Sequence, residues 1–82
     1  MAIKQSDPTG YAPAGPIHTV PPGPFAGRKV REAAVTAALA GVELGLYDHK
    51  IIDWLLDLDD PTVRTVVGLI WRAREAGSKE GA

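Results

Sequence analysis

The stretch DPTVRTVVGLIWRARE, residues 60–75, decides the fold. It opens with Asp60 and Pro61, a strong helix start, because aspartate accepts hydrogen bonds from free backbone N–H groups and proline fits the first helical position. Apolar side chains then recur at helical spacing from Val63 to Ala73. On a helical wheel they cover roughly 200°, whereas a surface helix needs a stripe of about 100°. The stretch therefore predicts a third helix over about residues 61–76, with more apolar surface than two short neighbours can cover.

Two further helices are expected before it. Residues 28–44 are rich in alanine and contain no proline, which predicts a helix over about residues 28–45 that ends at Gly45. Asp48 is placed as the N-cap of a shorter helix over about residues 48–58. The prediction is a small all-α fold: a three-helix unit over residues 28–77, followed by a flexible tail over residues 78–82.

Residues 1–27 differ in composition. Six of the seven prolines lie in the first 24 positions. Because proline fixes φ and lacks an N–H group, this segment is expected to be an extended arm. Apolar side chains that could act as anchors are spaced through it. Such an arm loses less conformational entropy on binding than a flexible segment does.

Composition limits what the chain can do. It has 82 residues, a net charge of -1 and no cysteine. A helical unit of about 50 residues has a marginal core, since burial at about 25 cal/mol per Å² barely offsets about 1.5 kcal/mol of entropy per ordered residue. Disulfides and thiolate metal sites cannot help, which leaves self-association or docking on a partner. The N-terminus has no apolar signal region and no run is long enough to span a bilayer, so we expect a soluble, non-secreted protein, cytoplasmic or part of a viral particle.

Catalytic candidates are few. His18 lies in the arm, and His49 is followed four residues later by Asp53. This pair could ligate a metal, but one imidazole with carboxylates makes a poor zinc site. The sequence has neither a glycine-rich phosphate loop nor a Ser/His/Asp arrangement. We therefore expect no catalytic residue, metal site or cofactor.

A helix-turn-helix DNA-binding regulator is the alternative hypothesis, with residues 60–72 as the recognition helix. A motif that begins at His49 places apolar residues at all five expected positions, but its two diagnostic positions hold Asp53 and Asp57 instead of a small residue and a glycine. Acidic side chains near the turn would repel phosphates. The side chains that favour DNA are Thr62, Arg64, Thr65, Gly68 and Arg72, with Arg28, Lys29 and Arg31 as a basic arm.

The preferred hypothesis is a non-catalytic protein-binding or assembly role, in which the arm and the apolar third helix clamp larger subunits. The marginal core, the excess apolar surface and the arm all point to it. The partner would be another protein, a larger assembly or a second copy of the chain. The residues expected to contact it are Tyr11, Ile17, Val20, Phe25, Arg64, Leu69, Trp71 and Arg72.

Residues 39–75 resemble a group of short proteins from actinobacteria and their phages. The shared pieces are GVELG at residues 41–45, Tyr47 with Asp48, Ile51 with Trp54 and Leu55, and residues 61–73. The resemblance brings no established activity. It implies a phage or mobile-element setting, in which the protein would be an accessory structural component, of the minor or decoration type, whose arm threads between larger subunits.

Overall fold

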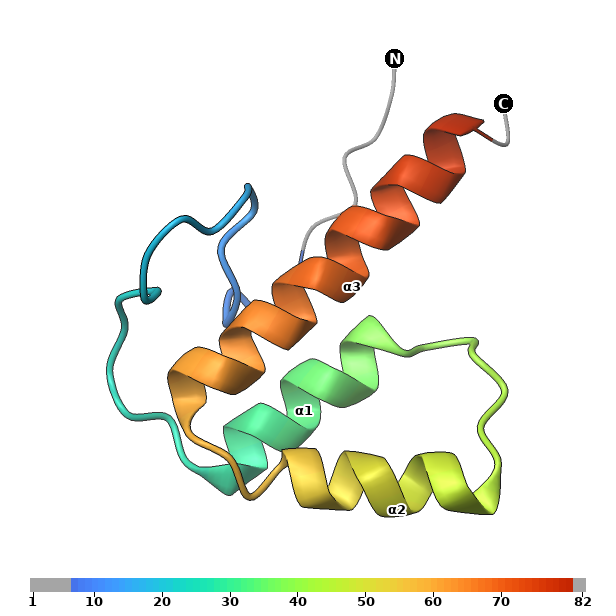
Figure 1. Ribbon diagram of the computed structural model, residues 1–82, viewed down its shortest axis with the longest axis horizontal. Coiled ribbons are helices and arrows are strands. Elements are labelled where there is room, and N and C mark those ends of the chain that lie inside the picture. Colours follow the sequence, from blue (N-terminus) through green and yellow to red (C-terminus); the bar gives the residue numbers. More distant parts are fainter. Residues whose placement is uncertain (1–6, 81–82) are drawn as a thin grey trace.

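The computed structural model describes residues 7–80, and within that range the chain forms three helices and no strand. They are α1 (Arg28–Ala38), α2 (Leu46–Leu55) and α3 (Asp60–Glu80). Helices α1 and α3 pack side by side and run in the same direction, and α2 leads the chain back from the end of α1 to the start of α3 (Figure 1). The predicted all-α fold is confirmed.

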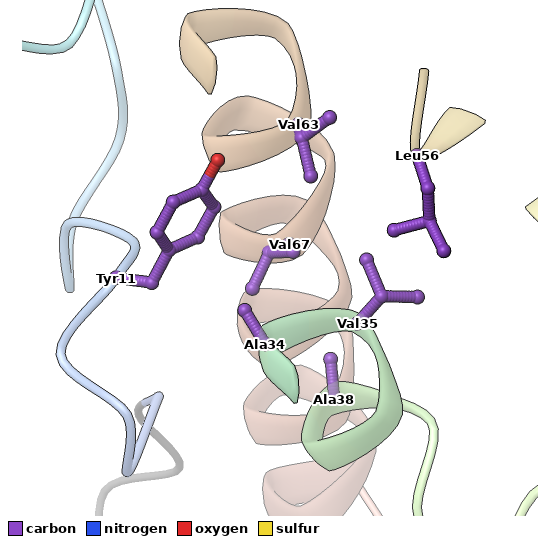
Figure 2. Packing of buried hydrophobic residues seen from close by; sticks show 7 residues of the cluster. All are labelled: Tyr11, Ala34, Val35, Ala38, Leu56, Val63 and Val67. Carbon is purple, nitrogen blue, oxygen red and sulfur yellow. The ribbon is translucent and has the colours of Figure 1, made fainter. Parts of the chain in front are cut away.

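The core is small and draws on the arm as well as the helices. Figure 2 shows its members: Tyr11 of the arm, Ala34, Val35 and Ala38 of α1, Leu56 after α2, and Val63 and Val67 of α3. The two alanines are completely buried, and such small side chains allow the backbones of α1 and α3 to approach closely. Helix α2 contributes no buried residue. The interior is therefore built mainly from α1, α3 and the arm, with Leu56 added from the connection after α2, while Ile52 and Leu55 of α2 pack against its edge.

Helix α1 is shorter than predicted, because it ends at Ala38 instead of continuing to about residue 45. Gly41 has a φ of +85°, in the left-handed region that glycine adopts without strain. The Arg74 guanidinium of α3 donates from Nη1 to the carbonyl oxygens of Ala38 at 3.1 Å and Ala40 at 3.0 Å. These bonds satisfy carbonyl groups that a longer helix would have used. The chain then crosses to α2 as a loop.

Helix α2 begins two residues before the predicted cap. Gly45 is the N-cap, and Asp48 lies in the first turn, where its Oδ2 accepts a hydrogen bond from the Gly45 N–H at 2.9 Å. A carboxylate in the first turn also interacts favourably with the helix dipole. Asp48 thus stabilises the helix start from inside the helix.

Helix α3 is capped by Asp59, not by Asp60 as predicted. The Thr62 N–H donates to Asp59 Oδ1 at 3.0 Å, and the Val63 N–H donates to the Asp59 carbonyl oxygen at 3.1 Å. Asp60 is consequently the first helical residue, and its carboxylate is available for other contacts. At its other end α3 continues to Glu80, through residues that we expected in the tail; residues 81–82 lie outside the described part of the chain.

The described part of the arm, residues 7–27, has no helix or strand and passes along α3 (Figure 1). It is not fully extended, because Asp7 Oδ2 accepts the Ala12 N–H at 2.9 Å and holds a turn. Further along, the arm crosses α3 at Gly68, where an added Cβ would lie 3.4 Å from Ile17 Cδ1. The arm thus covers part of the apolar surface of α3 that the two other helices were predicted to leave exposed.

Candidate functional site

Asp60 joins the arm, α1 and α3. Its side chain is only 4% exposed, and both carboxylate oxygens accept hydrogen bonds from distant parts of the sequence. Oδ1 accepts from the Tyr11 hydroxyl at 2.8 Å and from Arg31 Nη1 at 3.2 Å, while Oδ2 accepts from the Ala26 N–H at 2.8 Å. Because Asp59 provides the helix cap, Asp60 can make all three contacts.

The protonation states in this cluster follow from its contacts. The hydrogen bond from the Ala26 N–H, supported by Tyr11 and Arg31, holds the pKa of Asp60 below its usual value although burial acts in the opposite direction. Burial raises the pKa of the Tyr11 hydroxyl, and the hydrogen bond to Asp60 raises it further. At neutral pH, Asp60 is therefore an ionised acceptor and Tyr11 a protonated donor.

Two buried arginines complete the cluster. Arg31 Nε donates to the Leu56 carbonyl oxygen at 3.0 Å, which ties α1 to the connection between α2 and α3. Arg64 Nη2 donates to the Pro24 carbonyl oxygen at 2.6 Å, and its Cζ lies 4.7 Å from the centre of the Tyr11 ring. The cluster therefore holds the arm on the helices, and its polar groups are used within the chain.

The structure separates the residues that we expected to contact a partner. Tyr11 and Arg64 are brought together, but in the interior, so neither presents a surface to a partner in this conformation. Ile17 is half-buried against Gly68. Of the eight residues predicted to contact a partner, only Val20 and Phe25 of the arm and Leu69 of α3 are exposed.

Two other predicted contact residues on α3 are half-buried. Arg72 Nε donates to the Gly68 carbonyl oxygen at 3.2 Å. Trp71 lies under Arg74, whose Cζ is 5.3 Å from the ring centre. The Trp71 Nε1 atom is buried and has no hydrogen-bond partner among the described residues. Both side chains therefore make contacts along their own helix, and only part of each reaches solvent.

Among the described residues, α2 carries four exposed large apolar side chains, whereas α3 carries one, Leu69. Leu46 is 92% exposed, Tyr47 71% and Trp54 60%, and Ile51 is also exposed. Tyr47, Ile51 and Trp54 follow the i, i+4, i+7 spacing of a single helix face. We call these four residues the α2 surface. Exposed aromatic side chains gathered on one face are typical of protein-binding sites.

The sequence contained the signal for this surface, since the spacing of Tyr47, Ile51 and Trp54 can be read directly. It did not reveal which side of the helix faces the core. The inward positions of this segment are Ile52, Leu55 and Leu56, which form an apolar stripe of their own. A helix that is apolar on two sides does not indicate which of them is covered.

The proposed DNA-recognition face of α3 is not a free surface. Arm residues 17–21 line a shallow depression of about 550 Å³ together with Pro61, Thr62, Thr65 and Val66. Arg64 is buried beneath the arm. The expected basic arm is also divided, because Arg28 pairs with Asp53 at 2.6 Å and with Asp57, while Arg31 pairs with Asp60.

A smaller cavity of about 270 Å³ lies between α1, the loop and α2. Its lining is mainly aliphatic, with Thr36 and His49 as the polar members: Val35, Thr36, Leu39, Ala40, Leu44, His49 and Ile52.

Among the described residues, no group of three or more His, Asp or Glu side chains is arranged to hold a metal ion. Within residues 7–80, no helix combines the length and hydropathy needed to cross a membrane. Comparison of the chain with protein-family models, curated proteins and solved structures found no match.

Proposed function

We propose that this chain is a non-catalytic protein-binding module that docks on a partner chain, either a second copy or a different protein, through the α2 surface. One observation carries the proposal: α2 has no buried residue and exposes Leu46, Tyr47, Ile51 and Trp54. The core is formed without this face, so the fold does not require it to be apolar. A partner that covers the face would bury these side chains, and burial of apolar surface is the main favourable contribution to association.

The composition of the α2 surface suits this role. Tyrosine and tryptophan, with arginine, are enriched among the few interface residues that dominate binding energy, and truncation of such a residue to alanine costs at least about 2 kcal/mol of binding free energy. A helix that presents i, i+4 and i+7 side chains matches a common mode of recognition, in which its face lies in an apolar groove. Val20 and Phe25 of the arm are exposed and available for additional contacts.

This proposal modifies the expected clamp. Tyr11 and Ala26 hold the arm on the helical unit through Asp60, so the arm would act mainly as part of the fold, with only its exposed side chains free to meet a partner. The setting that we propose, an accessory structural component of a phage particle or another large complex, is supported by the resemblance of residues 39–75.

Site-specific photo-crosslinking tests the docking role. Tyr47 is replaced by p-benzoylphenylalanine in the full chain, expressed in its native cell, and the covalent adducts are identified after irradiation. We expect an adduct at this position and a marked loss of it when Trp54→Ala is added. The matched control places the same group at Glu32, an exposed position on α1 outside the α2 surface. Absence of any adduct at position 47, or equal labelling at both positions, would contradict the proposal.

A further inference from the structure

We infer that the partner of the α2 surface is the α2 surface of a second copy of this chain, in an antiparallel arrangement about a two-fold axis. The inference rests on the proposed function and names the partner. It is carried by the pattern of the helix itself, because a two-fold interface requires that one surface be complementary to itself.

The sequence of α2 has this symmetry. LYDHKIIDWL, residues 46–55, begins with Leu-Tyr-Asp and ends with Asp-Trp-Leu. When two such helices run antiparallel with the axis beside Lys50 and Ile51, Tyr47 of each copy lies opposite Trp54 of the other. The Ile51 side chains of the two copies then meet near the axis. The dimer therefore contains two equivalent Tyr47–Trp54 pairs, and aromatic pairs of this kind favour edge-to-face or offset contact.

The charged residues beside the α2 surface also meet across the two-fold axis. Lys50 and Asp53 lie on the same flank of the helix, and antiparallel pairing about a two-fold axis brings that flank of one copy beside the same flank of the other. Because the axis passes beside Lys50, the two copies of Lys50 lie next to each other on this flank. Each Lys50 also comes within reach of Asp53 of the other copy, whose carboxylate offsets the repulsion between the two cations. Arg28 occupies Oδ1 of Asp53, which leaves Oδ2 for a second cation.

The area of the α2 surface limits the expected affinity of the dimer. A helix of ten residues is about 15 Å long, and stable complexes usually bury about 800 Å² on each partner. Contact through α2 alone falls short of that area. We therefore expect a weak, concentration-dependent dimer, with a dissociation constant in the micromolar range or above.

The full chain is tested first by sedimentation equilibrium at concentrations from about 5 to about 500 µM, a range that spans such an equilibrium. The average mass should rise from 8.7 kDa toward twice that value. Trp54→Ala should raise the dissociation constant at least tenfold while the helical circular dichroism is retained, since Trp54 is exposed. A chain that stays monomeric throughout would overturn the inference.

Engineered cysteines test the geometry, because the native chain has none. Under mild oxidation Ile51→Cys should form a disulfide-linked dimer rapidly, since the two copies of this residue meet near the axis. Leu46→Cys is the matched control: it is more exposed, but its two copies would lie at opposite ends of the helix pair, about 13 Å apart along the axis. Equal rates would indicate random collision or parallel pairing and would refute the antiparallel dimer.

The two proposals can fail separately. A photo-crosslinked adduct at position 47 with twice the mass of the chain supports both. An adduct with a different protein, combined with a monomer in sedimentation, supports the docking role and overturns self-pairing. A monomer that gives no adduct overturns both.

Discussion

The most direct test of the fold is Asp60→Asn. Asparagine keeps the shape of the side chain but has an NH₂ group in place of one carboxylate oxygen. The groups that donate hydrogen bonds to that oxygen therefore lose their acceptor. It also leaves the Arg31 guanidinium, which is 8% exposed, without its charged partner. Breaking a buried ion pair from one side costs roughly 3–5 kcal/mol. A chain of this length has only about 4–12 kcal/mol of total stability, so the loss is a large share of it.

The measurement is urea unfolding followed by circular dichroism at 222 nm, together with thermal unfolding. A loss of 3 kcal/mol corresponds to a fall of at least about 12 °C in Tm for a domain of this size. The matched control is Asp59→Asn at the neighbouring position. Asparagine is as good an N-cap as aspartate, and Asp59 is exposed, so the control should remain close to the native stability.

The pH dependence gives a second readout. The folded pKa of Asp60 is lowered, so its stabilising contribution is present above the pKa of about 3.9 that aspartate has in the unfolded chain. That contribution is lost as the pH falls through the lower folded pKa. The stability difference between the native chain and Asp60→Asn should therefore shrink below about pH 4. If the two asparagine variants were equally stable at pH 7, the assignment of Asp60 as the central contact would be wrong.

Four further variants test the contacts of the arm and the surface ion pairs, each measured as the free energy of unfolding in urea. Tyr11→Phe removes the hydroxyl that donates to Asp60 and should cost about 1.5–3 kcal/mol; no change would mean that the arm is not held in solution. Gly23→Ala should destabilise the fold by about 1–3 kcal/mol, because φ is +153° and the new Cβ would lie 2.8 Å from Arg64 Cζ. Gly68→Ala, by contrast, should be neutral or stabilise by up to about 1 kcal/mol, since alanine favours the helix and its Cβ would make ordinary contacts, with Ile17 Cδ1 at 3.4 Å, the Pro13 carbonyl oxygen at 3.7 Å and Ala12 Cβ at 3.9 Å; the reverse order of the two glycine variants would contradict the described path of the arm. Arg28→Ala should cost less than about 1 kcal/mol, with the effect absent in 1 M salt, because both of its ion pairs are exposed; a larger, salt-independent loss would argue against these surface pairs.

The existence and approximate position of the helices could be predicted from the sequence. Capping residues, alanine content and proline placement influence about four neighbouring residues each. These local signals were sufficient to predict the order of the three helices and the all-α fold. They could not decide between Asp59 and Asp60 as the cap of α3, because both residues fit locally. That choice depends on Tyr11, Ala26 and Arg31, whose donors reach Asp60 from far away in the sequence.

The end of α1 was also beyond local signals. Residues 39–44 are compatible with a helix, and only Arg74, from α3, shows which carbonyl groups are satisfied without one. The candidate site depended on the same kind of information. Apolar side chains recur at helical spacing in both α2 and α3, but this spacing does not say which face another segment covers.

The sequence by itself determined that the chain is helical after residue 27, that its core is small and that some apolar surface would be left over. Only the tertiary structure decided where that surface lies. Arm residues 7–27 lie on α3, with Ile17 against Gly68 and Tyr11 bonded to Asp60, whereas no described segment covers the outer face of α2. The physical reason is that each residue's propensity is local, while burial depends on contacts between residues distant in the sequence, here as many as 49 positions apart.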